Sequence, residues 1–157
     1  MADVAQMRGV SKRFGGFAAL DGVDLTVSGG VIRGFLGPNG AGKTTAMRIL
    51  VGLLRSSEGE TRVFGGDPWT QPEVRAEIGF LPSDPGFYSR MSGKALLDHF
   101  AALSRRAPVL RSHACEHLRM SDADLARQVR HYSKGMRQKL GILQAVQHDP
   151  QLLIMDE

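Results

Sequence analysis

The sequence has 157 residues, of which 42% are hydrophobic and 23% charged, the composition of a globular protein large enough for a sizeable core. The formal charge of +4 is mildly basic, but no basic run with interleaved aromatic residues indicates a nucleic-acid surface. A single cysteine excludes an internal disulfide, and no stretch has the length or character of a membrane span or a signal peptide, so we expect a cytosolic protein.

The N-terminal quarter of the chain is predicted to form strands. Residues 4–10 can form a first strand, and residues 23–27 alternate apolar and polar side chains, which is typical of a half-buried strand. Residues 13–16 are turn-like, and the Ser-Gly-Gly sequence at 28–30 predicts a second turn. The mostly apolar residues 31–36 that follow are expected to form a buried strand.

A glycine-rich motif follows at residues 37–45 and fits the pattern G-x-x-x-x-G-K-[ST] of a phosphate-binding loop. Its glycines let backbone N–H groups point into a concavity around a phosphate chain. Lys43 supplies a charge for the β- and γ-phosphates, and the Thr44 hydroxyl is a ligand for Mg²⁺. The residues expected to bind nucleotide here are Gly37, Pro38, Asn39, Gly40, Ala41, Gly42, Lys43, Thr44 and Thr45.

The rest of the chain is expected to combine short strands with helices. Apolar spacing predicts a helix directly after the loop, whose N-terminus adds partial positive charge at the phosphates. Further strands are expected at 61–64, 78–81 and 152–155, and further helices at 72–77, 94–104, 111–118, 121–130 and 133–148. The continuous apolar run at 152–155 is typical of a parallel strand that is buried on both faces.

The last apolar run, at 152–155, is followed by Asp156 and Glu157. Four apolar residues and an acid form a Walker B element, whose aspartate reaches Mg²⁺ at the carboxyl end of the strand. Upstream, residues 132–138 read Tyr-Ser-Lys-Gly-Met-Arg-Gln, and Ser133 and Gly135 match the signature motif of ABC transporter ATPases. With these motifs the chain resembles the ATP-binding domain of that family over essentially its whole length, in a variant familiar from bacterial drug-export branches. A second interpretation of Ser133 is an ordinary helix N-cap.

The resemblance implies an α/β fold, with a P-loop NTPase core, an N-terminal antiparallel β part and a helical insert. It implies that Phe14 stacks on adenine, although Phe14 could also be a core or turn aromatic residue. Ser133 and Gly135 would face the γ-phosphate bound by a second subunit, and Glu157 would orient or deprotonate the attacking water. Asp156 would hold Mg²⁺ together with Thr44.

The resemblance also implies how such a domain works in the cell. Binding and hydrolysis of ATP would close and reopen two such ATPase domains, and partner transmembrane permease subunits would export a substrate. No nucleic acid is expected as a partner, and the protein would lie in the cytoplasm, peripherally on the inner face of the cell membrane. The chain would be a single partial domain, with β strands and the loop core at 1–81, a mainly helical insert at 82–132 and the signature helix and Walker B strand at 133–157.

Three departures from the family pattern leave alternatives open. Ser83 stands where the family has a glutamine, so either Asp84 takes its place or coupling to the membrane partner is altered. Lys134 replaces the first glycine of the signature. The sequence ends at Glu157 without the family's later histidine, so the domain is expected to be incomplete, to bind ATP weakly and to hydrolyse hardly any. A non-catalytic remnant or regulator, and a non-transport ABC protein acting on ribosomes or DNA, are the competing hypotheses.

Overall fold

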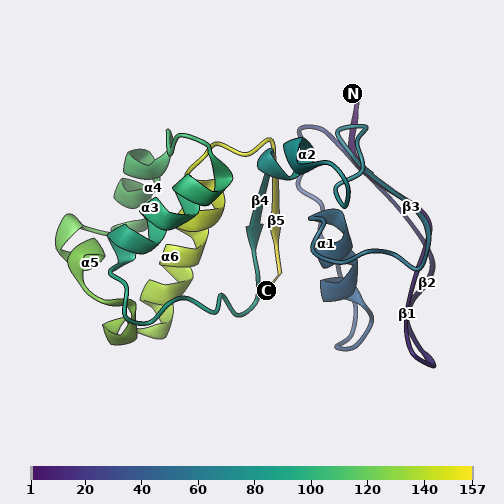
Figure 1. Ribbon diagram of the computed structural model, residues 1–157, viewed down its shortest axis with the longest axis horizontal. Coiled ribbons are helices and arrows are strands. Elements are labelled where there is room, and N and C mark those ends of the chain that lie inside the picture. Colours follow the sequence, from purple (N-terminus) through teal and green to yellow (C-terminus); the bar gives the residue numbers. More distant parts are fainter. Residues whose placement is uncertain (1, 157) are drawn as a thin grey trace. The chain divides into compact units, whose positions relative to one another are not determined.

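The computed structural model describes residues 2–156, and it divides them into two compact units (Figure 1). The first unit contains the residues up to Arg75 together with Asp156, and the second contains Ala76–Met155. Among the described residues, no helix is both long enough and apolar enough to span a membrane. Each unit is built around its own small sheet.

The sheet of the first unit is antiparallel, with strand order β2-β1-β3. Its strands are β1 (Asp3–Phe14), β2 (Phe17–Ser28) and β3 (Glu58–Val63). The strands predicted at 4–10 and 23–27 are confirmed, but both are longer than expected. The first turn is accordingly shorter, because only Gly15 and Gly16 connect β1 to β2, and the φ of +56° at Gly15 suits a tight two-residue hairpin loop.

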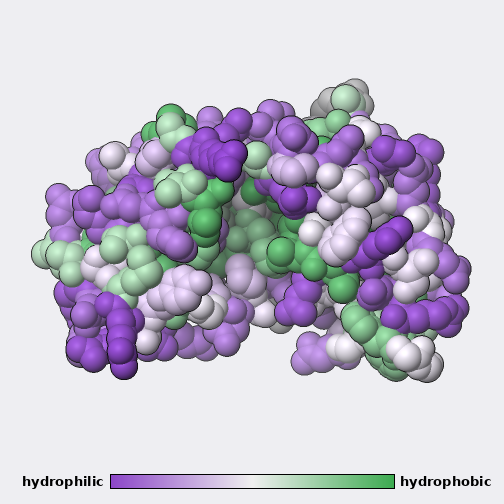
Figure 2. Space-filling view, viewed as in Figure 1, coloured by the Kyte–Doolittle hydropathy of each residue, from purple (hydrophilic) through white to green (hydrophobic). Residues whose placement is uncertain are grey.

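Helix α1 (Lys43–Leu50) follows the glycine-rich loop as predicted and packs against β2 and β3 (Figure 1). Its inward side buries Ala46, Met47, Ile49 and Leu50. The short helix α2 (Pro72–Ala76) forms at the predicted position. The visible surface over β2 and β3 is mostly hydrophilic (Figure 2). Hydrophobic residues, drawn in green, are visible at the free end of the β1–β2 hairpin.

The strand expected at residues 31–36 is not present, and this prediction was wrong. The segment has no regular secondary structure, and Ile32 and Leu36 are 104% and 95% exposed. A strand exists only where a neighbour supplies hydrogen bonds to its backbone. No strand within the described residues pairs with this segment, so its apolar composition alone does not order it as a strand.

In the second unit, β4 (Ile78–Leu81) and β5 (Leu152–Met155) pair in parallel, with Ile78 opposite Leu152. Both strands have the predicted bounds. The helices of this unit are α3 (Gly93–Ser104), α4 (Arg111–Leu118), α5 (Asp122–Ala126) and α6 (Lys134–Val146). The helix expected at 121–130 is instead α5 followed by a separate 3₁₀ turn, η1 (Val129–His131), because the backbone is extended at Arg127.

β5 is not buried on both faces, which corrects the prediction for residues 152–155. Leu153 and Met155 are 40% and 57% exposed, and they alternate with partly buried neighbours. Helix α6 packs closely on the sheet: a Cβ atom at Gly79 of β4 would lie 2.3 Å from the Ala145 oxygen. The two-stranded sheet thus has one covered face, and residues of β5 on its other face are open to solvent.

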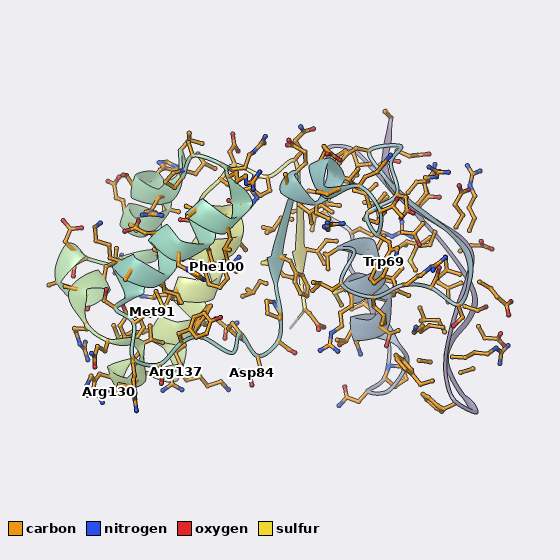
Figure 3. The ribbon with its side chains drawn as sticks, viewed as in Figure 1. Trp69, Asp84, Met91, Phe100, Arg130 and Arg137 are labelled. Carbon is orange, nitrogen blue, oxygen red and sulfur yellow. The ribbon has the colours of Figure 1, made fainter. Side chains whose placement is uncertain are left out.

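The core of the second unit lies between its helices. Its buried members are Leu96, Leu97, Met120, Leu125, Val129, Tyr132, Leu140 and Leu143. Met91 and Phe100 pack against this cluster beside α3 and α6 (Figure 3). This core holds the beginning of α6, where Ser133 and Gly135 lie.

Candidate nucleotide-binding site

The glycine-rich loop closes around the ammonium group of Lys43. The Nζ atom of Lys43 donates hydrogen bonds to the backbone oxygens of Gly37, at 2.7 Å, and Pro38, at 3.0 Å. The φ angles of Gly40 and Gly42 are +83° and +85°, a region that side-chain-bearing residues rarely adopt. The chain therefore turns sharply twice within the loop, while the loop surface stays exposed and accessible to a phosphate chain.

Close packing at Gly42 ties the loop to strand β2. A Cβ atom at this position would lie 2.4 Å from the Ala19 oxygen and 2.6 Å from a methyl group of Leu20, so only glycine fits. Leu20 pairs with Lys12 of β1, two residues before Phe14 at the end of the hairpin. Because a strand rises about 3.4 Å per residue, Phe14 lies about 7 Å further along β1 than Lys12, the residue opposite Leu20.

Thr44 and Asp156, 112 residues apart in the sequence, meet in the first unit. The Thr44 hydroxyl donates a hydrogen bond of 3.1 Å to a carboxylate oxygen of Asp156. Asp156 is only 4% exposed, and no ion pair within the described residues involves it. A buried carboxylate beside a hydroxyl, with no cationic side chain to compensate it, suits a hard cation with oxygen ligands such as Mg²⁺.

Phe14 lies at the end of the β1–β2 hairpin and is 51% exposed, so it is a turn-edge aromatic residue and not part of the core. The ammonium nitrogen of Lys12 lies 5.0 Å from the centre of the Phe14 ring, a cation–π contact. Sequence reasoning missed Lys12, although side chains two apart on a strand share a face and this spacing was available. The adenine-stacking role of Phe14 stays a prediction.

Ser133 and Gly135 stand at the beginning of α6 in the second unit. The Ser133 hydroxyl accepts a hydrogen bond of 3.2 Å from the Met136 N–H, so its N-cap interpretation is confirmed. Open space surrounds Gly135, where a Cβ atom would find nothing nearer than the Ser133 hydroxyl at 4.0 Å. Arg130 and Arg137 flank the start of α6, and both are exposed (Figure 3). This positive, uncrowded helix start can accept an anion.

The start of α6 is anchored to helix α5. The buried Tyr132 donates a hydrogen bond of 2.7 Å from its hydroxyl to the Asp124 backbone oxygen, and burial raises the pKa of this phenol. Ser121 and Asp124 form a capping box at α5, and the hydrogen bonds from Ser121 lower the pKa of the Asp124 carboxyl. Ser133 is therefore held in place by the residue that precedes it.

The remaining site residues are less defined by their surroundings. Ser83 and Asp84 are both exposed, and neither has a side-chain hydrogen bond within the described part of the chain (Figure 3 labels Asp84). The choice between them as a replacement for the glutamine therefore stays open. Glu157, the predicted catalytic base, lies outside the described residues.

Comparison with known proteins places this geometry in a family. The model of the ABC transporter family matches residues 20–157. The chain belongs to the ABC transporter ATP-binding family. It is 41% identical, over 165 residues, to the daunorubicin resistance ATP-binding protein DrrA3 of Streptomyces coeruleorubidus, and 40% identical, over 167 residues, to the Nod factor export ATP-binding protein I of Cupriavidus metallidurans.

Both alignments cover 100% of this chain, but only 51% and 53% of the two relatives, so the chain spans about half of their length. A solved ATP-binding subunit of an ABC transporter matches 98% of the chain with a TM-score of 0.87 and 25% identity, and the chain covers 66% of that structure. A dimeric bacterial ABC transporter cassette matches in fold, with a TM-score of 0.85 and 19% identity. The predicted ABC-type α/β fold, with its antiparallel β part, is confirmed.

Proposed function

We propose that this chain is the nucleotide-binding part of an ATPase that drives export of a substrate through partner transmembrane subunits. The observation that carries the proposal is the hydrogen bond between Thr44 and Asp156. It brings Thr44, which follows Lys43 of the loop, to Asp156, which follows β5 in the sequence. A site for a nucleotide–Mg²⁺ complex requires such a hydroxyl and such an acid together.

Each residue has a role that follows from its chemistry. The backbone N–H groups of the loop from Asn39 onward would point at the phosphates. The Lys43 ammonium would exchange its loop carbonyl partners for phosphate oxygens. Thr44 and Asp156 would hold Mg²⁺, which neutralises charge on the phosphates. Phe14 stacks on the base. Thr45, the second threonine of the motif, completes the expected nucleotide-binding set.

Transfer of a γ-phosphate needs groups beyond the loop. Ser133 and Gly135 of one copy are proposed to contact the γ-phosphate held by a second ATPase domain, in a homodimer or a heterodimer. Glu157 is proposed to orient or deprotonate the attacking water. These roles rest on the family's motifs, and the exposed, positively charged start of α6 supports the first of them.

Export is supported by relatives whose names record daunorubicin resistance and Nod factor export. We propose that the protein acts on the cytoplasmic face of the cell membrane, bound to permease subunits. Affinity purification of the native protein from solubilised membranes tests this proposal. An integral membrane protein in the eluate is expected, and ribosomes in its place would contradict the export role.

Equilibrium binding of ATP tests the site itself. Lys43→Ala is expected to reduce the affinity at least tenfold, because a charge-assisted contact to phosphate is lost. Thr44→Val is expected to weaken binding when Mg²⁺ is present and to have no effect in excess EDTA, because only the metal-linked part of the affinity needs the hydroxyl. Lys94→Ala and Thr26→Val remove the same groups from exposed positions elsewhere and are the matched controls. Equal loss in EDTA for Thr44→Val would contradict the metal assignment.

A further inference from the structure

Helix α4 carries two exposed histidines one turn apart, and the nucleotide site uses neither of them. His113 and His117 have ring centroids 4.2 Å apart, with their planes inclined by 48°. Residues at positions i and i+4 share one face of a helix. Two neutral imidazoles in this arrangement are a donor pair that late first-row transition ions favour.

The hydrogen bonding of His117 leaves one ring nitrogen ready to bind an ion. Its Nδ1 lies 2.9 Å from the His113 backbone oxygen. A carbonyl oxygen only accepts, so Nδ1 is the donor, and in the neutral ring the free lone pair is on Nε2. Metal-bound histidines in proteins are commonly oriented in this way, by a carbonyl that accepts from the other ring nitrogen.

Among the described residues, the side chains next to His113 and His117 add no third metal ligand to the two imidazoles. Cys115 packs against the hydrophobic core of the second unit and is only partly exposed, so its thiol is directed to the core and does not lie beside the two exposed histidine rings. Glu116 is exposed, but within residues 2–156 no group of three or more potential ligands has the geometry to hold a metal. Water would complete the coordination of an ion bound between the two rings.

We propose that His113 and His117 form a clamp for one divalent late transition ion, with Cu²⁺ bound most tightly. The clamp offers two nitrogen donors, whereas the site of Thr44 and Asp156 offers oxygen atoms to Mg²⁺. Hard ions such as Mg²⁺ and Ca²⁺ prefer oxygen and are not expected at the clamp, while affinities for imidazole nitrogen peak at copper. The proposal is independent of nucleotide binding.

Titration of the untagged full chain with CuCl₂, in the presence of excess Mg²⁺, tests the clamp. We expect one Cu²⁺ per chain, with an electron paramagnetic resonance spectrum that shows coupling to two imidazole nitrogens. Loss of a residue that only hydrogen-bonds to a metal ligand lowers the affinity of metal sites by about 10–100-fold. His113→Ala or His117→Ala, each of which removes a ligand itself, should therefore lower the copper affinity at least about tenfold. Each variant should also abolish the two-nitrogen spectrum.

His131→Ala is the matched control, because His131 is exposed but its ring lies 3.1 Å from the guanidinium Nε of Arg130, a poor environment for a cation. Alanine is the strongest helix former, so the α4 variants should stay folded, which circular dichroism checks. His117→Gln provides a second test with a side chain of similar size. Copper affinity that is the same in the wild type, His113→Ala and His117→Ala would overturn the proposal.

Discussion

Replacement of Gly42 by alanine tests how tightly the phosphate-binding loop is packed, and Gly40→Ala is its matched control. The two glycines have nearly equal φ angles, +85° and +83°. They differ in their surroundings: a Cβ atom at Gly42 meets Ala19 and Leu20 at 2.4 and 2.6 Å, whereas a Cβ atom at Gly40 meets nothing within 4 Å. The pair therefore separates backbone strain from steric overlap.

The structure allows both costs to be estimated. An alanine in the left-handed region costs about 1–2 kcal/mol, partly offset by the lower entropy of the unfolded chain, so Gly40→Ala should destabilise the first unit by about 1 kcal/mol. Gly42→Ala adds overpacking worth about 1–3 kcal/mol, because the atom that it meets first is a backbone oxygen and cannot move aside alone. The expected difference between the variants is about 2 kcal/mol.

Urea unfolding followed by tryptophan fluorescence measures this difference. Trp69 is the only tryptophan in the sequence, and it belongs to the first unit, beside α1 (Figure 3), so its emission reports on the unit that holds the loop. With a slope of about 2 kcal/mol per molar urea, Gly42→Ala should unfold at a urea concentration about 1 M below Gly40→Ala. Equal midpoints would refute the view that β2 braces the loop at Gly42.

Two further predictions concern the second unit, whose helices are followed by far-ultraviolet circular dichroism. Gln147 is 2% exposed, donates to the Leu97 oxygen at 3.1 Å and accepts from Arg111 at 2.9 Å, so Gln147→Leu should destabilise the unit by about 1–3 kcal/mol, and an unchanged urea midpoint would contradict this. Burial lowers the pKa of His148 below its ordinary value of 6.5, so the unfolded chain takes up this proton at a higher pH than the folded chain does. Stability should therefore fall as the pH drops through about 6.5, and His148→Gln should reduce that fall.

Elements that are marked by local signals could be predicted from the sequence. β4, α4 and β5 form at the predicted residues 78–81, 111–118 and 152–155. Proline follows β4 and precedes β5, and the apolar runs are short, so residues next to each strand mark where it begins or ends. The two N-terminal strands and a turn between them were predicted as well, although the length of the strands depends on cross-strand pairing that extends to Phe14 and Phe17.

Features that depend on a partner strand could not be predicted in this way. Residues 31–36 and β5 have the same apolar character, but only β5 has a paired neighbour among the described strands. Likewise, the exposure of Leu153 and Met155 follows from what covers each face of a two-stranded sheet. The apolar composition of a segment shows that the segment can be buried, but it does not show whether another strand or helix lies there to cover it.

The candidate site shows the same division between local and distant information. The loop could be recognised because its chemistry is contiguous: glycines, Lys43 and Thr44 lie within nine residues. The partnership of Thr44 with Asp156 could not be derived from spacing, since 112 residues separate them, and it was expected only through the family resemblance. No pattern in neighbouring residues of the sequence indicates that Ala19 packs against Gly42. Glycine at position 42 of the G-x-x-x-x-G-K-[ST] pattern is therefore required for two separate reasons, the approach of the phosphate and the close packing against β2. Comparison of Gly42→Ala with Gly40→Ala measures the effect of the packing without any nucleotide.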